Sequence, residues 1–255
     1  MRIRSLAAAV RIASMILLAQ GFAAGAAEVK VVAAAPMTAV LKELGPQFER
    51  DTGHKLVIRF APTPAVKREI DAGETFDVAI SVTSGIDDLI KEGKIVAGTR
   101  AAVAFTGLGV GVRAGAPKPD IRSVDAVKRT LLNAKSVAHS AEGASVAIFK
   151  GMLERIGIAE EMRPKLKPLA GSGLESFVSG DAEIVVLFVP TIVAASGVEL
   201  VGLFPSELQT YLSFAAGVGT SAMEPGAAQA LIKFLTAPKA AAIIKAKGME
   251  PGTPR

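Results

Sequence analysis

Few side chains in this sequence could perform covalent chemistry. It contains two histidines, His54 and His139, and no cysteine, which excludes disulfides, thiolate metal sites and thiol nucleophiles. His54 follows Gly53 at a predicted turn between a helix and a strand, and His139 ends a predicted strand. A structural or ligand-facing role is the favoured interpretation of both, because neither belongs to a recognisable triad or acid/base pair. We therefore predict no catalytic residue and no enzyme activity.

Motifs that hold nucleotides or metals are also missing. The sequence has no GxxxxGK[ST] phosphate loop, and the glycines of Gly107 to Gly111 alternate as in a strand, without the spacing of a dinucleotide-binding turn. Glu142, Asp181 and Glu183 lack the spacing of metal ligands. The sequence therefore predicts no metal centre and no cofactor.

A different pattern occurs four times: a predicted strand leads through small or hydroxyl-bearing residues into the start of a helix. The four loops are Ala35-Pro36-Met37, Pro62-Thr63-Pro64, Gly143-Ala144-Ser145 and Gly171-Ser172-Gly173. A helix start presents free N–H groups and the positive end of the helix dipole, which favours an anion. In open α/β sheets such loops lie beyond the carboxyl ends of the strands, so we expect all four to face one cleft. An ordinary helix cap remains the alternative for each loop taken alone.

The elements that must position these loops follow from the hydrophobic pattern. Val29 to Val32 predict a buried strand, and the apolar residues from Met37 to Phe48 recur at the spacing of one helix face, with Pro36 in its first turn. Strand and helix patterns then alternate almost throughout, which predicts an α/β fold with mainly parallel sheets. We expect Thr63 to cap a helix over 65–72 and Ser84 to cap a helix over 86–92.

Two stretches with small residues, 103–112 and 212–218, are candidates for strands that cross between two lobes. Crossings there would give a first lobe of 28–105 plus 218–255 and a second lobe of 106–217. The alternative is one continuous sheet. The apolar run 182–189 predicts the central strand of its sheet.

Residues 1–27 read as a cleavable signal peptide and not as part of the fold. A basic start with Arg2, Arg4 and Arg11 precedes a short apolar run and the small residues Ala24 to Ala27. An N-terminal membrane anchor is the alternative, but the run is short for a bilayer. Removing the three arginines lowers the formal charge from +5 to about +2, too mild for a nucleic-acid-binding protein. We predict a periplasmic protein.

Three runs resemble periplasmic molybdate-binding proteins, the solute receptors of ABC importers. They are VVAAAPMTAVLKELGPQFERDTGHKLVIRF, KREIDAGETFDVAIS and LIKFLTAPKAAAIIKAKGMEP. The resemblance covers essentially the whole chain after residue 27. It implies a type II periplasmic binding protein, with two α/β lobes joined by two crossing strands and a ligand cleft between them. It also implies a small anionic ligand of the molybdate or tungstate kind, an ABC permease in the inner membrane as partner, and a monomer.

The resemblance also suggests ligand positions, and several of them differ from the family. Pro36 stands where the family usually has a serine, and Thr63 is the remaining hydroxyl of a second loop that is serine-rich in the family. Ser145 adds a hydroxyl at a helix start, and a tyrosine of the family is replaced near Val189. Each missing buried hydrogen bond to a charged ligand costs about 1.5–3 kcal/mol. A small organic acid is therefore the alternative ligand, with a receptor that serves a sensor, or a periplasmic enzyme, as less favoured functions.

Overall fold

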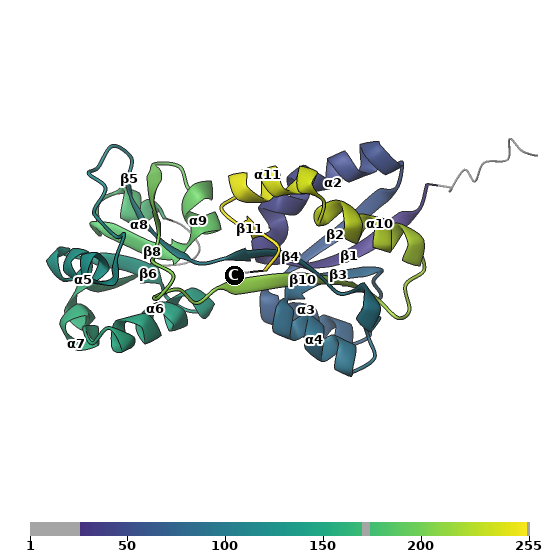
Figure 1. Ribbon diagram of the computed structural model, residues 1–255, viewed down its shortest axis with the longest axis horizontal. Coiled ribbons are helices and arrows are strands. Elements are labelled where there is room, and N and C mark those ends of the chain that lie inside the picture. The colour runs from purple at the N-terminus through teal and green to yellow at the C-terminus, as the bar shows by residue number, and fades with distance from the viewer. Residues whose placement is uncertain (1–25, 170–173, 254–255) are drawn as a thin grey trace, which may run out of the picture.

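Two α/β lobes lie end to end along the long axis of the molecule (Figure 1). The computed structural model describes residues 26–169 and 174–253. One sheet has the strand order β11-β4-β10-β3-β1-β2 and the other has the order β7-β6-β8-β5-β9. The predicted α/β class and two-lobed architecture are confirmed. The prediction of mainly parallel sheets is wrong, because both sheets are mixed and five of the nine strand pairings among the described residues are antiparallel.

The first lobe has a six-stranded sheet between two layers of helices (Figure 1). Its strands are β1 (Glu28–Ala34), β2 (Lys55–Ala61), β3 (Val78–Val82), β4 (Ala101–Thr106), β10 (Leu212–Val218) and β11 (Glu250–Pro251). Its helices are η1 (Ala35–Met37), α2 (Thr38–Thr52), α3 (Thr63–Asp71), α4 (Thr83–Lys91), η2 (Ala97–Thr99), α10 (Pro225–Leu235) and α11 (Pro238–Ala246). The helices α3 and α4 cover one face, and α2, α10 and α11 cover the other.

The second lobe repeats this layering on a smaller scale. Its strands are β5 (Leu108–Arg113), β6 (Val137–Ser140), β7 (Leu166–Leu169), β8 (Ile184–Phe188) and β9 (Val198–Leu203). Its helices are α5 (Val124–Asn133), α6 (Ala144–Arg155), α7 (Ala159–Met162), η3 (Arg163–Lys165), α8 (Glu175–Val178) and α9 (Val189–Ala194). The strand β8 lies in the middle of the sheet, as its apolar sequence predicted.

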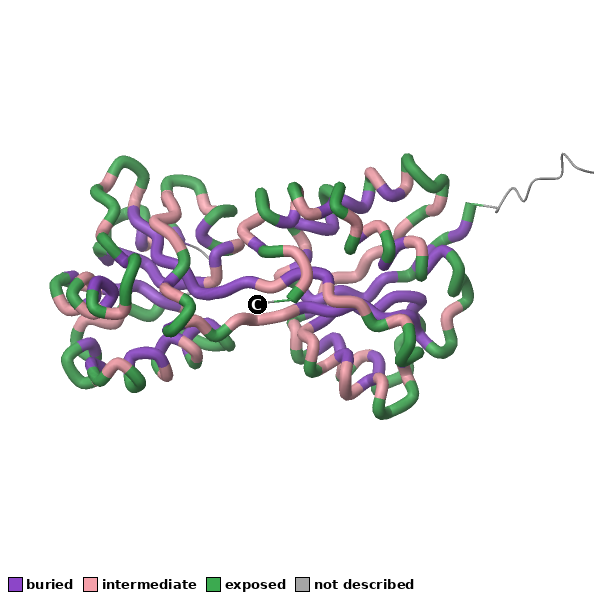
Figure 2. The backbone as a smooth tube through the Cα atoms, viewed as in Figure 1, coloured by how far each residue is buried: buried purple, intermediate pink, exposed green. Residues whose placement is uncertain are grey.

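The buried residues follow the sheets and the inner faces of the helices (Figure 2). In the first lobe they form one cluster, in which Phe48 of α2 and Phe214 of β10 are fully buried. In the second lobe they form two clusters. Phe149 of α6 belongs to one, and Phe177 of α8 belongs to the other.

Two helix starts differ from the sequence-based prediction. The helix α3 begins at Thr63 itself, with Pro62 at the N-cap position and no side-chain cap. The helix α4 begins at Thr83, so Ser84 lies inside the helix and not at its cap. The helix α4 thus starts directly after β3 and before Ser84, whereas α3 starts at Thr63 itself, with Pro62 between it and the end of β2.

The second crossing between the lobes also lies earlier than predicted. Residues 103–112 pass from β4 in one sheet to β5 in the other, with Gly107 between them. Residues 212–218, however, form β10 within the first sheet, where they pair with β3 and β4. The return crossing is therefore the segment 204–211, and residues 212–217 belong to the sheet of the first lobe.

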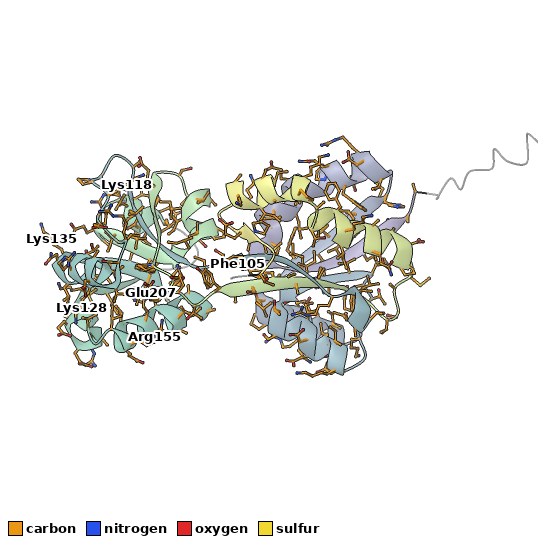
Figure 3. The ribbon with its side chains drawn as sticks, viewed as in Figure 1. Phe105, Lys118, Lys128, Lys135, Arg155 and Glu207 are labelled. Atoms are coloured by element: carbon orange, nitrogen blue, oxygen red, sulfur yellow. The ribbon has the colours of Figure 1, made fainter. Side chains whose placement is uncertain are left out.

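The Gln209 side chain ties the two crossings together. Its amide oxygen accepts a hydrogen bond from the Leu108 N–H at 3.1 Å, and its amide nitrogen donates to the Leu108 carbonyl at 2.6 Å. A Cβ atom at Gly107 would lie 2.5 Å from the Gln209 Oε1, so only glycine allows this approach. On the side of the first lobe, the rings of Phe105 (Figure 3) and Tyr211 pack edge to face, with centroids 5.2 Å apart.

None of the helices within 26–169 and 174–253 is by itself long and apolar enough to span a membrane. The helices α10 and α11 meet that test only as a pair, which is bent by 63° at the break between them.

Candidate functional site

The carboxyl ends of the parallel strands in each sheet point toward the other lobe. In the first sheet, β3 runs antiparallel to β10, and its end at Val82 pairs with Phe214, close to where the chain returns from the second lobe. In the second sheet, Phe188 at the end of β8 pairs with Leu108, the first residue after the crossing. In the first sheet, β1 and β2 run in the same direction as β3. In the second sheet, β6 runs in the same direction as β8. The loops that follow these strands therefore face one another across the crossings.

Three of the four predicted loops lie at these strand ends. Residues 35–37 form η1 directly after β1, residues 62–64 open α3 after β2, and residues 143–145 open α6 after β6. Ser172 and its loop, 171–173, fall outside the described residues. Loops from both lobes thus contribute to one candidate site, although the ligand contacts of the individual residues stay predictions.

On the first lobe, the strand-end loops offer proline rings and main-chain donors. Pro36 is partly exposed, whereas Met37 is fully buried with its side chain in the core of this lobe. The whole Met37 residue therefore lies in the core in this arrangement. Thr63 is partly exposed at the first position of α3, where N–H groups have no partner within the helix.

On the second lobe, the loop after β6 carries two serines that contact each other. Ser145 at the start of α6 is 7% exposed, and its hydroxyl lies 3.0 Å from the hydroxyl of Ser140. Gly143 is exposed and has φ 92°, a conformation that favours glycine. Ser140 is not among the predicted site residues, because the four-loop pattern is defined by helix starts and not by the last residue of the preceding strand. A hydroxyl residue five positions before Ser145 was the available signal.

Val189 packs at the crossing. It is 4% exposed, and its N–H donates to the Gly107 carbonyl at 3.2 Å. Cβ atoms placed on Gly109 or Gly248 would lie 2.9 Å from its methyl carbons. The Val189 side chain therefore fills the space between β5 and the segment after α11, and it joins the two lobes.

His139 and His54 both have structural partners. The His139 ring is 4% exposed, and its Nδ1 lies 2.6 Å from the Ser140 carbonyl oxygen. The His54 Nδ1 accepts a hydrogen bond from the Ala27 N–H at 3.2 Å, and its ring stacks on Phe48. His54 thus has the turn position that the sequence predicted.

The candidate site offers neutral donors to a ligand. Lys67, on α3, is held by Asp71 and Glu92, and these hydrogen bonds raise the pKa of Lys67 to about 12. On the strand-end loops that the structure describes, Glu142 is the one side chain that titrates as an acid or base. Within 26–169 and 174–253, no three histidine or acidic residues gather as metal ligands. The arrangement suits an anion held by N–H and hydroxyl groups.

Comparison with known proteins agrees with this architecture. Residues 29–250 match the family model of the bacterial extracellular solute-binding proteins. The aconitate isomerase of a Pseudomonas species is 30% identical over 227 residues, which cover 87% of this chain and 87% of that protein. The molybdate-binding protein ModA of Azotobacter vinelandii is 33% identical over 237 residues, covering 89% of this chain and 91% of ModA.

A solved structure supports the same fold. The periplasmic molybdate-binding protein of Azotobacter vinelandii superposes with a TM-score of 0.67 and 23% identity, covering 89% of this chain and 100% of that chain. The fold is therefore that of a type II periplasmic binding protein, as predicted.

Proposed function

The chain belongs to the bacterial extracellular solute-binding protein family, in its ModA-like branch, and on this premise we propose that it is the periplasmic receptor of an ABC importer for a small carboxylate. The observation that carries the proposal is the placement of helix starts from both lobes on opposite sides of the two crossings. A ligand that contacts both sides stabilises the closed arrangement of the lobes, and this is the whole mechanism of such a receptor.

Two features favour a carboxylate over a molybdate-type oxyanion. A tetrahedral oxyanion removed from water needs a donor for nearly every oxygen, and each one that is missing costs about 1.5–3 kcal/mol. Pro36 and Pro64 lack an N–H, so the loops after β1 and β2 offer fewer main-chain donors. Each carboxylate group has only two oxygens, and the carbon skeleton that carries it can contact the proline rings. The similarity to an aconitate isomerase also favours an organic acid.

The remaining parts of the proposal follow from the family. Residues 1–27 would direct export to the periplasm, and an inner-membrane permease would receive the ligand. A molybdate-type oxyanion is the second ligand class, supported by the 33% identity to ModA.

A second candidate function is isomerisation of a bound unsaturated carboxylate, which the 30% identical aconitate isomerase favours. Such a reaction needs a group that removes a proton from one carbon and returns it to another. Glu142 is the ionisable side chain on the described strand-end loops, and in this second function its carboxylate removes and returns the proton.

Calorimetric titration of ligand-free protein separates these functions. The titrants are molybdate, tungstate, sulfate, aconitate, citrate and succinate, each added alone. We expect one carboxylate to bind about 100-fold more tightly than molybdate, a difference of about 2.8 kcal/mol. Tighter binding of molybdate would reverse the ligand ranking, and no binding of any anion would refute the receptor function.

Incubation with aconitate, followed by NMR of the solution, tests the isomerase function. Turnover by the wild-type protein that is lost in Glu142→Gln would establish it. If the protein binds a carboxylate but leaves aconitate unchanged, the receptor function is supported and the isomerase function is refuted.

A further inference from the structure

We propose that Ser140 is the hydroxyl group that the second lobe donates to the ligand, and that Ser145 and His139 are positioning residues that act through it. This inference rests on the proposed function. It concerns a residue just before the loop that the sequence pattern indicated, at the end of β6 and not at the start of α6.

The first step concerns the direction of the hydrogen bond between the two serines. Their oxygens are 3.0 Å apart, and Ser145 is buried whereas Ser140 is partly exposed. An anionic ligand can only accept hydrogen bonds, so the hydroxyl that reaches it must donate its single proton to it. The oxygen of Ser140 is then free to accept from Ser145. The chain runs from Ser145 to Ser140 to the ligand, and each bond polarises the next.

The second step concerns the main chain at Ser140. The His139 Nδ1 lies 2.6 Å from the Ser140 carbonyl oxygen, and because a carbonyl only accepts, Nδ1 must carry the proton. The ring is 4% exposed and packs beside Phe149, with centroids 6.3 Å apart. This rigid ring therefore holds the last peptide of β6, from which the Ser140 side chain projects.

The third step explains why Ser145 is a weaker candidate than Ser140 for the hydroxyl that contacts the ligand. At 7% exposure its hydroxyl has little access to a ligand, and it already has a partner in the structure. Removing it takes away one hydrogen bond to Ser140, whereas removing Ser140 takes away the bond to the ligand itself. The two substitutions should therefore differ in size and should not add.

Calorimetric titrations with aconitate and with molybdate, each as a separate probe, test the inference. For the probe that binds the wild-type protein, Ser140→Ala should weaken binding about 10- to 100-fold, the size of a lost hydrogen bond to a charged group. Ser145→Ala should weaken it only about 3- to 5-fold, the range of a neutral hydrogen bond. The double variant should bind like Ser140→Ala. Ser136→Ala, at the opposite end of β6, is the matched control and should leave affinity unchanged.

Further variants control for a folding defect and test the positioning role of His139. Ser140→Cys keeps the size of the side chain with a weaker donor and should give an intermediate loss. His139→Asn retains an N–H donor and should bind more tightly than His139→Leu, which has none.

Two outcomes would overturn the inference while the receptor function stands: equal losses in Ser140→Ala and Ser145→Ala, or losses that add in the double variant. If the wild-type protein binds neither probe nor any other carboxylate or oxyanion, the proposed function fails, and this inference fails with it.

Discussion

The two lobes reach the same layered architecture from different arrangements of the chain. The sheet of the second lobe comes from one continuous segment, 108–203, whereas the sheet of the first lobe combines 28–106 with 212–251. The first lobe therefore depends on contacts between residues far apart in sequence. The Asp77 carboxylate is the clearest example, because it accepts hydrogen bonds from the N–H groups of Lys30, Met223 and Glu224 at 2.8, 2.7 and 3.1 Å.

The facing loops differ between the lobes as well. Those of the first lobe contain Pro36, Pro62 and Pro64, which restrict the backbone and remove donors. The loop after β6 contains Ser140 and Ser145, which supply hydroxyl groups. The comparison teaches that the two lobes present different chemistry at their strand ends: prolines with the Thr63 hydroxyl on the first lobe, and two hydroxyl groups in contact with each other on the second. Three substitutions away from the site test how far the lobes differ.

The largest effect is expected for Asp77→Ala. The Asp77 side chain is buried (2% exposed), and the substitution removes three main-chain hydrogen bonds to its carboxylate, a loss of about 3–5 kcal/mol in the free energy of unfolding. Hydrogen exchange should show faster exchange in β1 and β3 than in β6 and β8. The control Asp181→Ala removes an exposed carboxylate of the second lobe and should change little. An equal increase in the hydrogen-exchange rates of both lobes would contradict the expected difference between them.

A smaller effect is expected for Gln209→Leu, which cuts the tie between the crossings. The Leu108 N–H and carbonyl lose their side-chain partner, which should cost about 1–3 kcal/mol. Small-angle X-ray scattering of the ligand-free protein should show a broader range of lobe orientations. Gln229→Leu, on the exposed surface of α10, is the matched control. A scattering profile identical to that of the wild type would mean that the tie does not limit lobe movement.

The smallest effect is expected for Gly248→Ala, where the first lobe contacts the second. Its φ is 77°, and a Cβ would lie 2.9 Å from a Val189 methyl carbon and 3.1 Å from the Pro190 nitrogen. Gly252→Ala is a close control, because φ is 83° there but the added atom meets open space. Both should lose about 1 kcal/mol of stability from backbone strain. Only Gly248→Ala should also change the angle between the lobes, measured by small-angle X-ray scattering. If the two variants give the same scattering profile, the contact between Gly248 and Val189 adjusts without moving the lobes.

Much of the fold could be predicted from local patterns. The strand and helix alternation and the central position of β8 follow from periodicity and hydrophobicity, and the structure confirms them. The predicted caps at Thr63 and Ser84 were wrong because a helix can begin directly after a strand without a side-chain cap.

The details of the crossings and the candidate site could not be predicted in the same way. The tie from Gln209 to Leu108 spans 101 residues, and the sequence around either position does not indicate the other. The return crossing was placed too late because β10 has the same small-residue composition as a crossing strand. Ser140 could not be singled out from the sequence, because its contacts with Ser145 and His139 exist only in the folded chain.

The divided sheet of the first lobe also has a consequence for biosynthesis. A ribosome delivers β1, β2 and β3 first, but the edge of β3 stays without its neighbour until β10 is made, some 130 residues later. The segment in between holds all strands of the second lobe, which is free to fold as soon as it emerges. During that interval β3 has one open edge, and β4, which pairs only with β10 and β11, has no neighbouring strand, so both strands offer unpaired main-chain groups to another chain.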